Sequence, residues 1–145
     1  MNEWIKDIRT EVRATAIGFG TTEIKPGESK EIETWPQPLL FKAKMLIVPR
    51  DIAGDFEIEH LIFGQMSQFE PDATGASTGP GPGSRPAPVP ATFCDPENYR
   101  FPHRMRTIIR LGHRVVLQVK NTGSSKRTFV ASLFGDGEFE CWPHD

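Results

Sequence analysis

The sequence predicts an all-β domain: a single antiparallel β-sandwich of jelly-roll-like form. Two observations predict it. Apolar and polar residues alternate over short segments, and a Gly, Pro or Asn turn signal separates one segment from the next. Hydrophobic residues make up 37% of the 145 residues and charged residues 25%, which suits one domain over residues 1–145 with its own core.

Residues 1–16 are the first predicted element, an N-terminal arm or a short amphipathic helix. Apolar residues recur at helical spacing among charged ones, at Trp4, Ile5, Ile8 and Val12. Either this stripe packs on its own domain, or the segment is an arm that reaches a neighbouring molecule. In the second case the expected interface anchors are Trp4, Ile5 and Ile8.

Strand signals begin at Thr22 and are soon interrupted by a turn over residues 25–28. Pro26 sets φ at the second turn position and Gly27 accepts positive φ at the third, as a type II turn requires. A tight connection between two strands is expected here.

Two alternating segments follow, over residues 39–48 and 55–63. Because side chains alternate between the faces of a strand, each segment is expected to turn one set of residues toward the core. The first set is Phe41, Ala43, Met45 and Ile47, joined at the far end by Leu46 and Val48, and the second is Phe56, Ile58, His60 and Ile62.

Residues 71–92 are predicted to form a long loop rich in Pro and Gly. Residues 71–90 contain little apolar side chain to offset the entropy cost of ordering them. The loop is either a solvated insertion or a contact element that binds a partner or a symmetry mate.

Residues 108–133 are predicted to form a hairpin or meander with one buried face, turning at residues 121–125. Leu117 and Phe129 are expected on that buried face, opposite each other across the hairpin. The alternating apolar residues are Ile109, Leu111, Val115, Leu117, Val119, Phe129, Ala131 and Leu133.

Metal and cofactor sites are not predicted. No two of the four histidines are two or four residues apart, so the HxH pattern of a cupin-type metal site is absent from His60, His103, His113 and His144. His60 is interpreted as a core histidine. Cys94 and Cys141 form no CxxC motif and are interpreted as two free thiols, with a disulfide between them as the alternative.

No catalytic residues and no enzyme activity are predicted. Glu57 and Glu59 alternate along one strand and are interpreted as its solvated face, not as a glycosidase pair. The serines lack the Gly-x-Ser-x-Gly motif, and the Gly-rich segments do not open a helix as a phosphate-binding loop does.

The net charge of −2 makes nucleic acid an unexpected partner. No apolar run approaches the roughly 20 residues of a membrane helix, and the first residues lack an apolar signal core, so synthesis in a cytoplasm is expected. A local basic stretch is interpreted as a charged strand edge or as a contact with an acidic partner surface. Its residues are Arg104, Arg106, Arg110 and Arg114, of which Arg104 and Arg106 are the interface candidates.

Four segments of turn and core residues, at 24–29, 41–49, 52–69 and 127–135, resemble small β-sandwich virion proteins of bacteriophages. The resemblance implies a capsid or capsid-decorating cement protein, synthesised in the host cytoplasm and located in the virion. It also implies symmetric homo-oligomers and binding to a capsid shell protein. The alternative is a carbohydrate- or receptor-binding module that uses exposed aromatic residues, with Trp35, Tyr99 and Trp142 as candidates.

Overall fold

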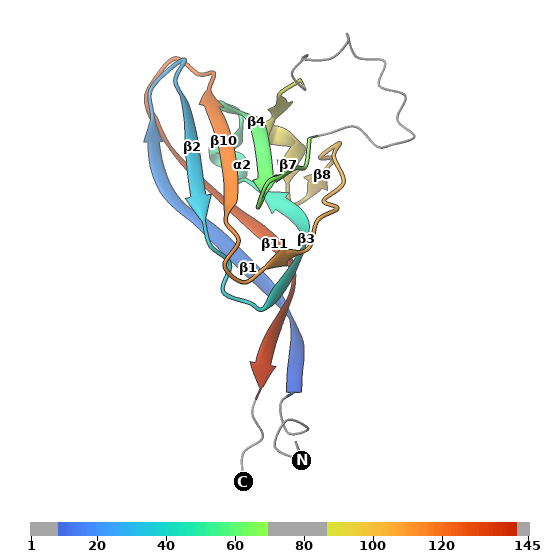
Figure 1. Ribbon diagram of the computed structural model, residues 1–145. Coiled ribbons are helices and arrows are strands. Elements are labelled where there is room, and N and C mark those ends of the chain that lie inside the picture. Colours follow the sequence, from blue (N-terminus) through green and yellow to red (C-terminus); the bar gives the residue numbers. More distant parts are fainter. Residues whose placement is uncertain (1–8, 70–86, 142–145) are drawn as a thin grey trace, which may run out of the picture.

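The structure, a computed structural model, describes residues 9–69 and 87–141. They form a nearly all-β domain in which two antiparallel sheets enclose one hydrophobic core (Figure 1). The predicted all-β sandwich is therefore confirmed.

The first sheet has the strand order β1-β11-β3-β9. Its strands are β1 (Arg9–Ile24), β11 (Arg127–Cys141), β3 (Leu40–Ile47) and β9 (Ile109–Arg110). The second sheet has the order β2-β10-β4-β5, and β6 also pairs with β4. Its strands are β2 (Ser29–Thr34), β10 (Val115–Asn121), β4 (Phe56–Phe63), β5 (Met66–Ser67) and β6 (Val89–Pro90).

The chain crosses repeatedly from one sheet to the other. β1 to β4 alternate between the sheets, and on the return β10 inserts between β2 and β4 while β11 inserts between β1 and β3. This interleaving of returning strands is the double Greek key of a jelly roll. The short strands β5 and β6 share the position next to β4.

One topological prediction is wrong. β10 and β11 lie in different sheets, so residues 122–126 form an arch across the core and not a hairpin. Leu117 and Phe129 are both buried, at 0% and 1% exposure, but they approach the core from opposite sheets. The alternation of apolar and polar residues shows only that each strand has one buried face. A hairpin within one sheet and an arch between two sheets both produce this pattern.

The predicted core face of β3 and β4 changes along each strand. In β3, Phe41, Ala43 and Leu46 are buried, and Val48, just beyond the strand end, is buried as well. The pairing of β3 with β11 shifts register between the partners of Ala43 and Met45. After this shift the other set of alternating side chains faces the core, so Met45 and Ile47 are only half-buried.

β4 has the same irregularity. Phe56 and Ile58 are buried, then Leu61 and Phe63, because the pairing with β10 shifts between the partners of Ile58 and His60. His60 and Ile62 are consequently half-buried. The prediction that His60 is a core residue is therefore wrong.

The structure also revises two boundaries. The first strand begins at Arg9 and not at Thr22, so residues 9–16 are an extended arm and not a helix. The end of the predicted 71–92 loop belongs to the fold, since Val89 and Ala91 are buried. Residues 71–86 lie outside the described part of the chain.

The turn at residues 25–28 agrees with its prediction. Gly27 has φ of 78°, and the Glu28 amide donates to the Lys25 carbonyl at 3.0 Å.

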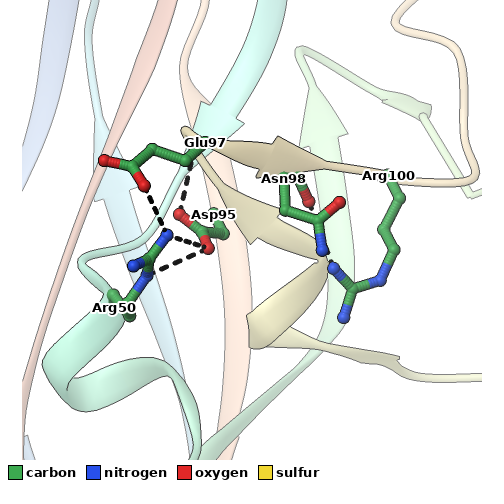
Figure 2. A network of polar contacts seen from close by, with 5 residues as sticks. All are labelled: Arg50, Asp95, Glu97, Asn98 and Arg100. Atoms are coloured by element: carbon green, nitrogen blue, oxygen red, sulfur yellow. Dashed lines mark hydrogen bonds and ion pairs between the residues drawn. The ribbon is translucent and has the colours of Figure 1, made fainter.

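A small substructure packs against the C-terminal end of β3, from which the chain continues into α2. It comprises α2 (Arg50–Ala53), the 3-10 turn η1 (Ala91–Phe93), β7 (Cys94–Asp95) and β8 (Asn98–Tyr99). Figure 2 shows Arg50 reaching from α2 to the β7–β8 hairpin, where its Nη2 donates to Asp95 and Glu97 carboxylate oxygens, each at 2.9 Å. The Glu97 amide donates to the other oxygen of Asp95. This amide and Arg50 hold the pKa of Asp95 below its ordinary value.

Candidate functional site

The most distinctive surface feature is the projecting end of the first sheet, called the ribbon and defined as residues 9–16 of β1 and 134–141 of β11, of which only residues 9–11 and 139–141 extend beyond β3. Its pairing runs continuously from Arg9 opposite Cys141 to Ala16 opposite Phe134. β3 accompanies β11 only as far as Glu138. In Figure 1 the start of β1 and the end of β11 lie side by side and project from the sandwich.

The long strand β1 has two halves of different character. Ile17, Phe19 and Ile24 are buried in the core. Side chains from Thr10 to Ala16 are exposed, apart from half-buried Thr15. The ribbon half therefore buries little of its own surface.

Two glycines let β11 pass from the core into the ribbon. A Cβ at Gly135 would overlap the Lys42 carbonyl of β3, and one at Gly137 would lie 2.8 Å from Thr15 Oγ1 and 2.9 Å from Pro38 Cγ. At Gly135 the neighbouring atoms are backbone, so only a residue without a Cβ fits, whereas at Gly137 they are side-chain atoms that a Cβ would displace. These glycines bring β3 and the Pro38 segment against the base of the ribbon.

The ribbon has two different faces, because directly opposite residues of antiparallel strands point to the same side. One face carries Val12, Ala14, Ala16, Phe134, Asp136 and Glu138. The other carries Glu11, Arg13, Thr15, Gly135, Gly137 and Phe139. Val12 is 65% exposed and Phe134 is 44% exposed, so the first face presents apolar surface to solvent.

Charged side chains organise the second face. Arg13 Nη2 lies 3.1 Å from Glu11 Oε2, and the Arg13 guanidinium carbon lies 4.8 Å from the centre of the Phe139 ring. Both charged side chains remain about half exposed, at 55% and 52%. An exposed pair of this kind contributes little stability, but it orients the two side chains at the strand edge.

A shallow hollow lies where the first ribbon face meets the sheet. Its volume is about 240 Å³, and its lining residues are Val12, Leu40, Lys42, Ile108, Asp136 and Glu138. Lys44 Nζ forms an ion pair of 2.9 Å with Asp136 beside it. The hollow thus combines exposed apolar residues, Val12 and the 50% exposed Ile108, with a charged rim.

The predicted interface anchors are not part of this geometry. Trp4, Ile5 and Ile8 lie outside the described residues. Arg104 and Arg106 are exposed in the segment between β8 and β9, and neither belongs to the ribbon or lines the hollow. The Arg106 amide donates to Gln68 Oε1 at 2.9 Å, which fixes this segment beside β5.

The basic stretch is divided by the fold. Arg110 lies on β9, whereas Arg114 pairs with Glu33 of β2 at 2.6 Å. Arg104 and Arg106 lie on no strand, so the prediction of one charged strand edge is wrong for these two residues. Sequence reasoning also missed the ribbon. The period-two pattern of Val12, Ala14 and Ala16 was the available signal.

The three aromatic candidates for ligand binding differ in their exposure to solvent. Trp35 is 52% exposed. Tyr99 is not an exposed platform, because it is half-buried and its hydroxyl accepts a hydrogen bond from the Leu46 amide at 3.1 Å. Burial raises its pKa to about 12. Trp142 lies outside the described residues.

His60, His103 and Cys94 lie in aromatic or buried surroundings. His60 lies against Phe69 with ring centres 5.8 Å apart, and its buried Nδ1 has no hydrogen-bond partner in the described structure. His103 stacks on Phe69 at 4.4 Å, and burial lowers its pKa. Cys94 is a buried free thiol whose pKa burial raises to about 12.

Within residues 9–69 and 87–141, no group of three or more His, Cys, Asp and Glu residues is placed to hold a metal ion. None of the helices in these ranges is long and apolar enough to cross a membrane.

No family model, curated protein or solved structure matches this chain. The function must therefore be inferred from the fold and from the geometry of the ribbon.

Proposed function

We propose that this protein is a non-enzymatic structural subunit of a virion, a capsid or capsid-decorating component that assembles symmetrically. Its partners would be further copies of itself and a capsid shell protein. The projecting ribbon is the observation that carries the proposal. The resemblance of the turn and core segments to small phage virion proteins supplies the virion context.

The ribbon is costly for an isolated domain. Ordering backbone costs about 1–2 kcal/mol per residue. Most β1 side chains in the ribbon are exposed, so little burial offsets that cost within the subunit. A partner that covers the ribbon would supply the missing burial. Extended arms that reach a neighbouring subunit are an economical way to build a symmetric assembly, because each copy both offers and receives the same contact.

The fold supports the proposal as an analogy. Jelly rolls include viral capsid proteins, lectins and cupins, so the topology admits assembly without specifying it. The rigid sandwich would hold the ribbon and the hollow beside it in a fixed orientation. The apolar residues Val12, Phe134 and Ile108 would form the contact.

Deletion of Met1–Glu11 tests the proposal. This deletion removes part of the ribbon but leaves the buried residues of β1 from Ile17 onward. We expect sedimentation velocity to show a symmetric oligomer for the full chain and a smaller species for the truncated chain, with unchanged circular dichroism. A full chain that stays monomeric and does not bind a shell particle would contradict the proposal.

A carbohydrate- or receptor-binding module is the second candidate, and exposed Trp35 is the observation that favours it. The Gln37 side chain, two residues along the chain, donates to the Trp35 backbone carbonyl at 3.3 Å, so a polar side chain is held near this exposed aromatic residue. Trp35→Ala distinguishes the two functions. It should leave assembly intact under the structural proposal, whereas glycan binding that this change abolishes would favour the module.

A further inference from the structure

The outer edge of β1 is open along the ribbon. β1 is the terminal strand of its sheet: β11 pairs with one edge, and no described strand pairs with the other. Backbone N–H and C=O groups along such an edge are able to bind another extended chain. Residues 9–16 include no proline and no residue with positive φ, so nothing in their backbone interrupts the edge.

The other described sheet edges are protected by length or by charge. β9 and β5 have two residues each. β2 has six residues, but Lys30, Glu31 and Glu33 are exposed on it. Short and charged edges resist pairing. β1 also carries exposed charges, at Glu11 and Arg13, but it has 16 residues and presents Val12, an exposed apolar residue, between them.

The ribbon segment of β1 is complementary to itself in the antiparallel direction. When Val12 of one copy lies opposite Val12 of a second, Glu11 lies opposite Arg13 and Arg13 opposite Glu11. Opposite charges and apolar pairs directly across antiparallel strands are stabilising. Thr10 then faces Ala14, so the small and apolar residues share one side and the charges share the other.

Other symmetric antiparallel registers between two β1 strands place less favourable side chains opposite each other. A two-fold axis at Glu11 places two carboxylates opposite each other, and one at Arg13 places two guanidinium groups opposite each other. Like charges in this position are destabilising. An axis at Ala14 leaves Glu11 opposite the buried Ile17.

We propose that the β1 edge pairs antiparallel with β1 of a second copy about a two-fold axis at Val12. The first sheets of both copies then form one continuous sheet, and the Val12 side chains meet beside the hollow of each subunit. This inference rests on the proposed function, because it specifies which surface makes the symmetric contact. The self-complementary charges on Glu11 and Arg13 identify a second copy as the occupant.

Cysteine crosslinking tests the register. All variants are full-length and carry Cys141→Ser, so that the introduced thiol is the reporter. Val12→Cys places two thiols directly opposite each other, within disulfide reach. Ala14→Cys and Thr10→Cys are the matched controls on the same face, where the proposed register separates identical residues by about 13 Å. Oxidation should crosslink the Val12→Cys variant alone.

Charge reversal tests the chemistry of the contact. Glu11→Arg should weaken association roughly tenfold, because two symmetry-related attractive pairs become repulsive. The double variant Glu11→Arg, Arg13→Glu should recover most of the affinity. Glu31→Arg makes the same change on the exposed β2 strand and should have no effect.

The outcomes separate this inference from the proposed function. An oligomer that forms equally well with Glu11→Arg, or that crosslinks through Thr10→Cys or Ala14→Cys, overturns the β1 register and leaves structural assembly standing. A full chain that is monomeric at every concentration and binds no shell particle overturns both.

Discussion

Arg13 lies over the ring of Phe139, with 4.8 Å between the guanidinium carbon and the ring centre. The contact is diagonal across the ribbon, since Arg13 is paired with Gly137 and Phe139 with Glu11. Gly137 has no side chain to occupy the space between them. Glu11, Arg13 and Phe139 therefore form one contact group, which holds the two strands of the ribbon together at the point where β3 ends.

Replacing Phe139 with Ala should loosen the ribbon and spare the sandwich. The lost cation–π contact is worth about 0.5–1 kcal/mol at an exposed site. Amide hydrogen exchange of residues 10–16 should therefore quicken in dilute, unassembled protein, while the melting temperature changes little. A large drop in melting temperature would show that the ribbon is part of the cooperative core.

Core truncations should be far more costly. Leu117 and Phe129 are 0% and 1% exposed, and the Phe129 ring meets Phe56 edge-to-face at 4.9 Å. Replacing either with Ala should lower the free energy of unfolding by about 2–5 kcal/mol, since each change removes burial and leaves a cavity. Urea denaturation measures this loss. Leu111→Ala, at a 53% exposed position outside the ribbon, is the control and should stay within about 0.5 kcal/mol.

Gly135 and Gly54 make a matched pair for testing the close approach of β11 to β3. Gly135→Ala should destabilise by about 1–3 kcal/mol, because the new methyl overlaps the Lys42 carbonyl and backbone must move. Gly54 has φ of −64° and open space around a Cβ, so Gly54→Ala should be neutral or slightly stabilising. Equal melting curves for the two variants would contradict the observed strand spacing.

Cys94 should make stability fall in alkaline solution. Burial raises the pKa of its thiol from 9.0 to about 12, so between these values the unfolded chain loses a proton that the folded chain retains. The contribution is fully present below pH 9 and is lost as pH rises toward 12, by up to about 1.4 kcal/mol per pH unit. Cys94→Ala should flatten this part of the stability curve. Identical slopes for both proteins would show that the thiol is not shielded.

Much of the framework was predictable because it depends on local chemistry. The Pro26–Gly27 turn requires its two residues, and alternation marked the buried faces around Leu117 and Phe129. Neither signal states which strand is the neighbour. Alternation alone therefore predicts a hairpin where the structure has an arch between β10 and β11.

The predictions for His60, Met45 and Val12 are wrong for one physical reason. The pairing of a strand with its neighbours decides which side chains are buried, and this overrides the local sequence pattern. His60 and Met45 leave the core because bulges in the pairing of β4 and β3 shift the buried face by one residue. Val12 fits a helical stripe with Trp4 and Ile8, yet pairing with β11 makes it extended and exposed. The period-two pattern of Val12, Ala14 and Ala16 indicates a strand, but only the pairing of β1 with β11 makes it a ribbon.

Hydrogen exchange as a function of protein concentration shows whether the ribbon is the assembly surface. Amides of residues 10–16 should exchange more slowly as the full chain associates, while amides of the β2 edge, residues 29–34, exchange at unchanged rates. An association that slows exchange elsewhere and leaves residues 10–16 unaffected would contradict the account.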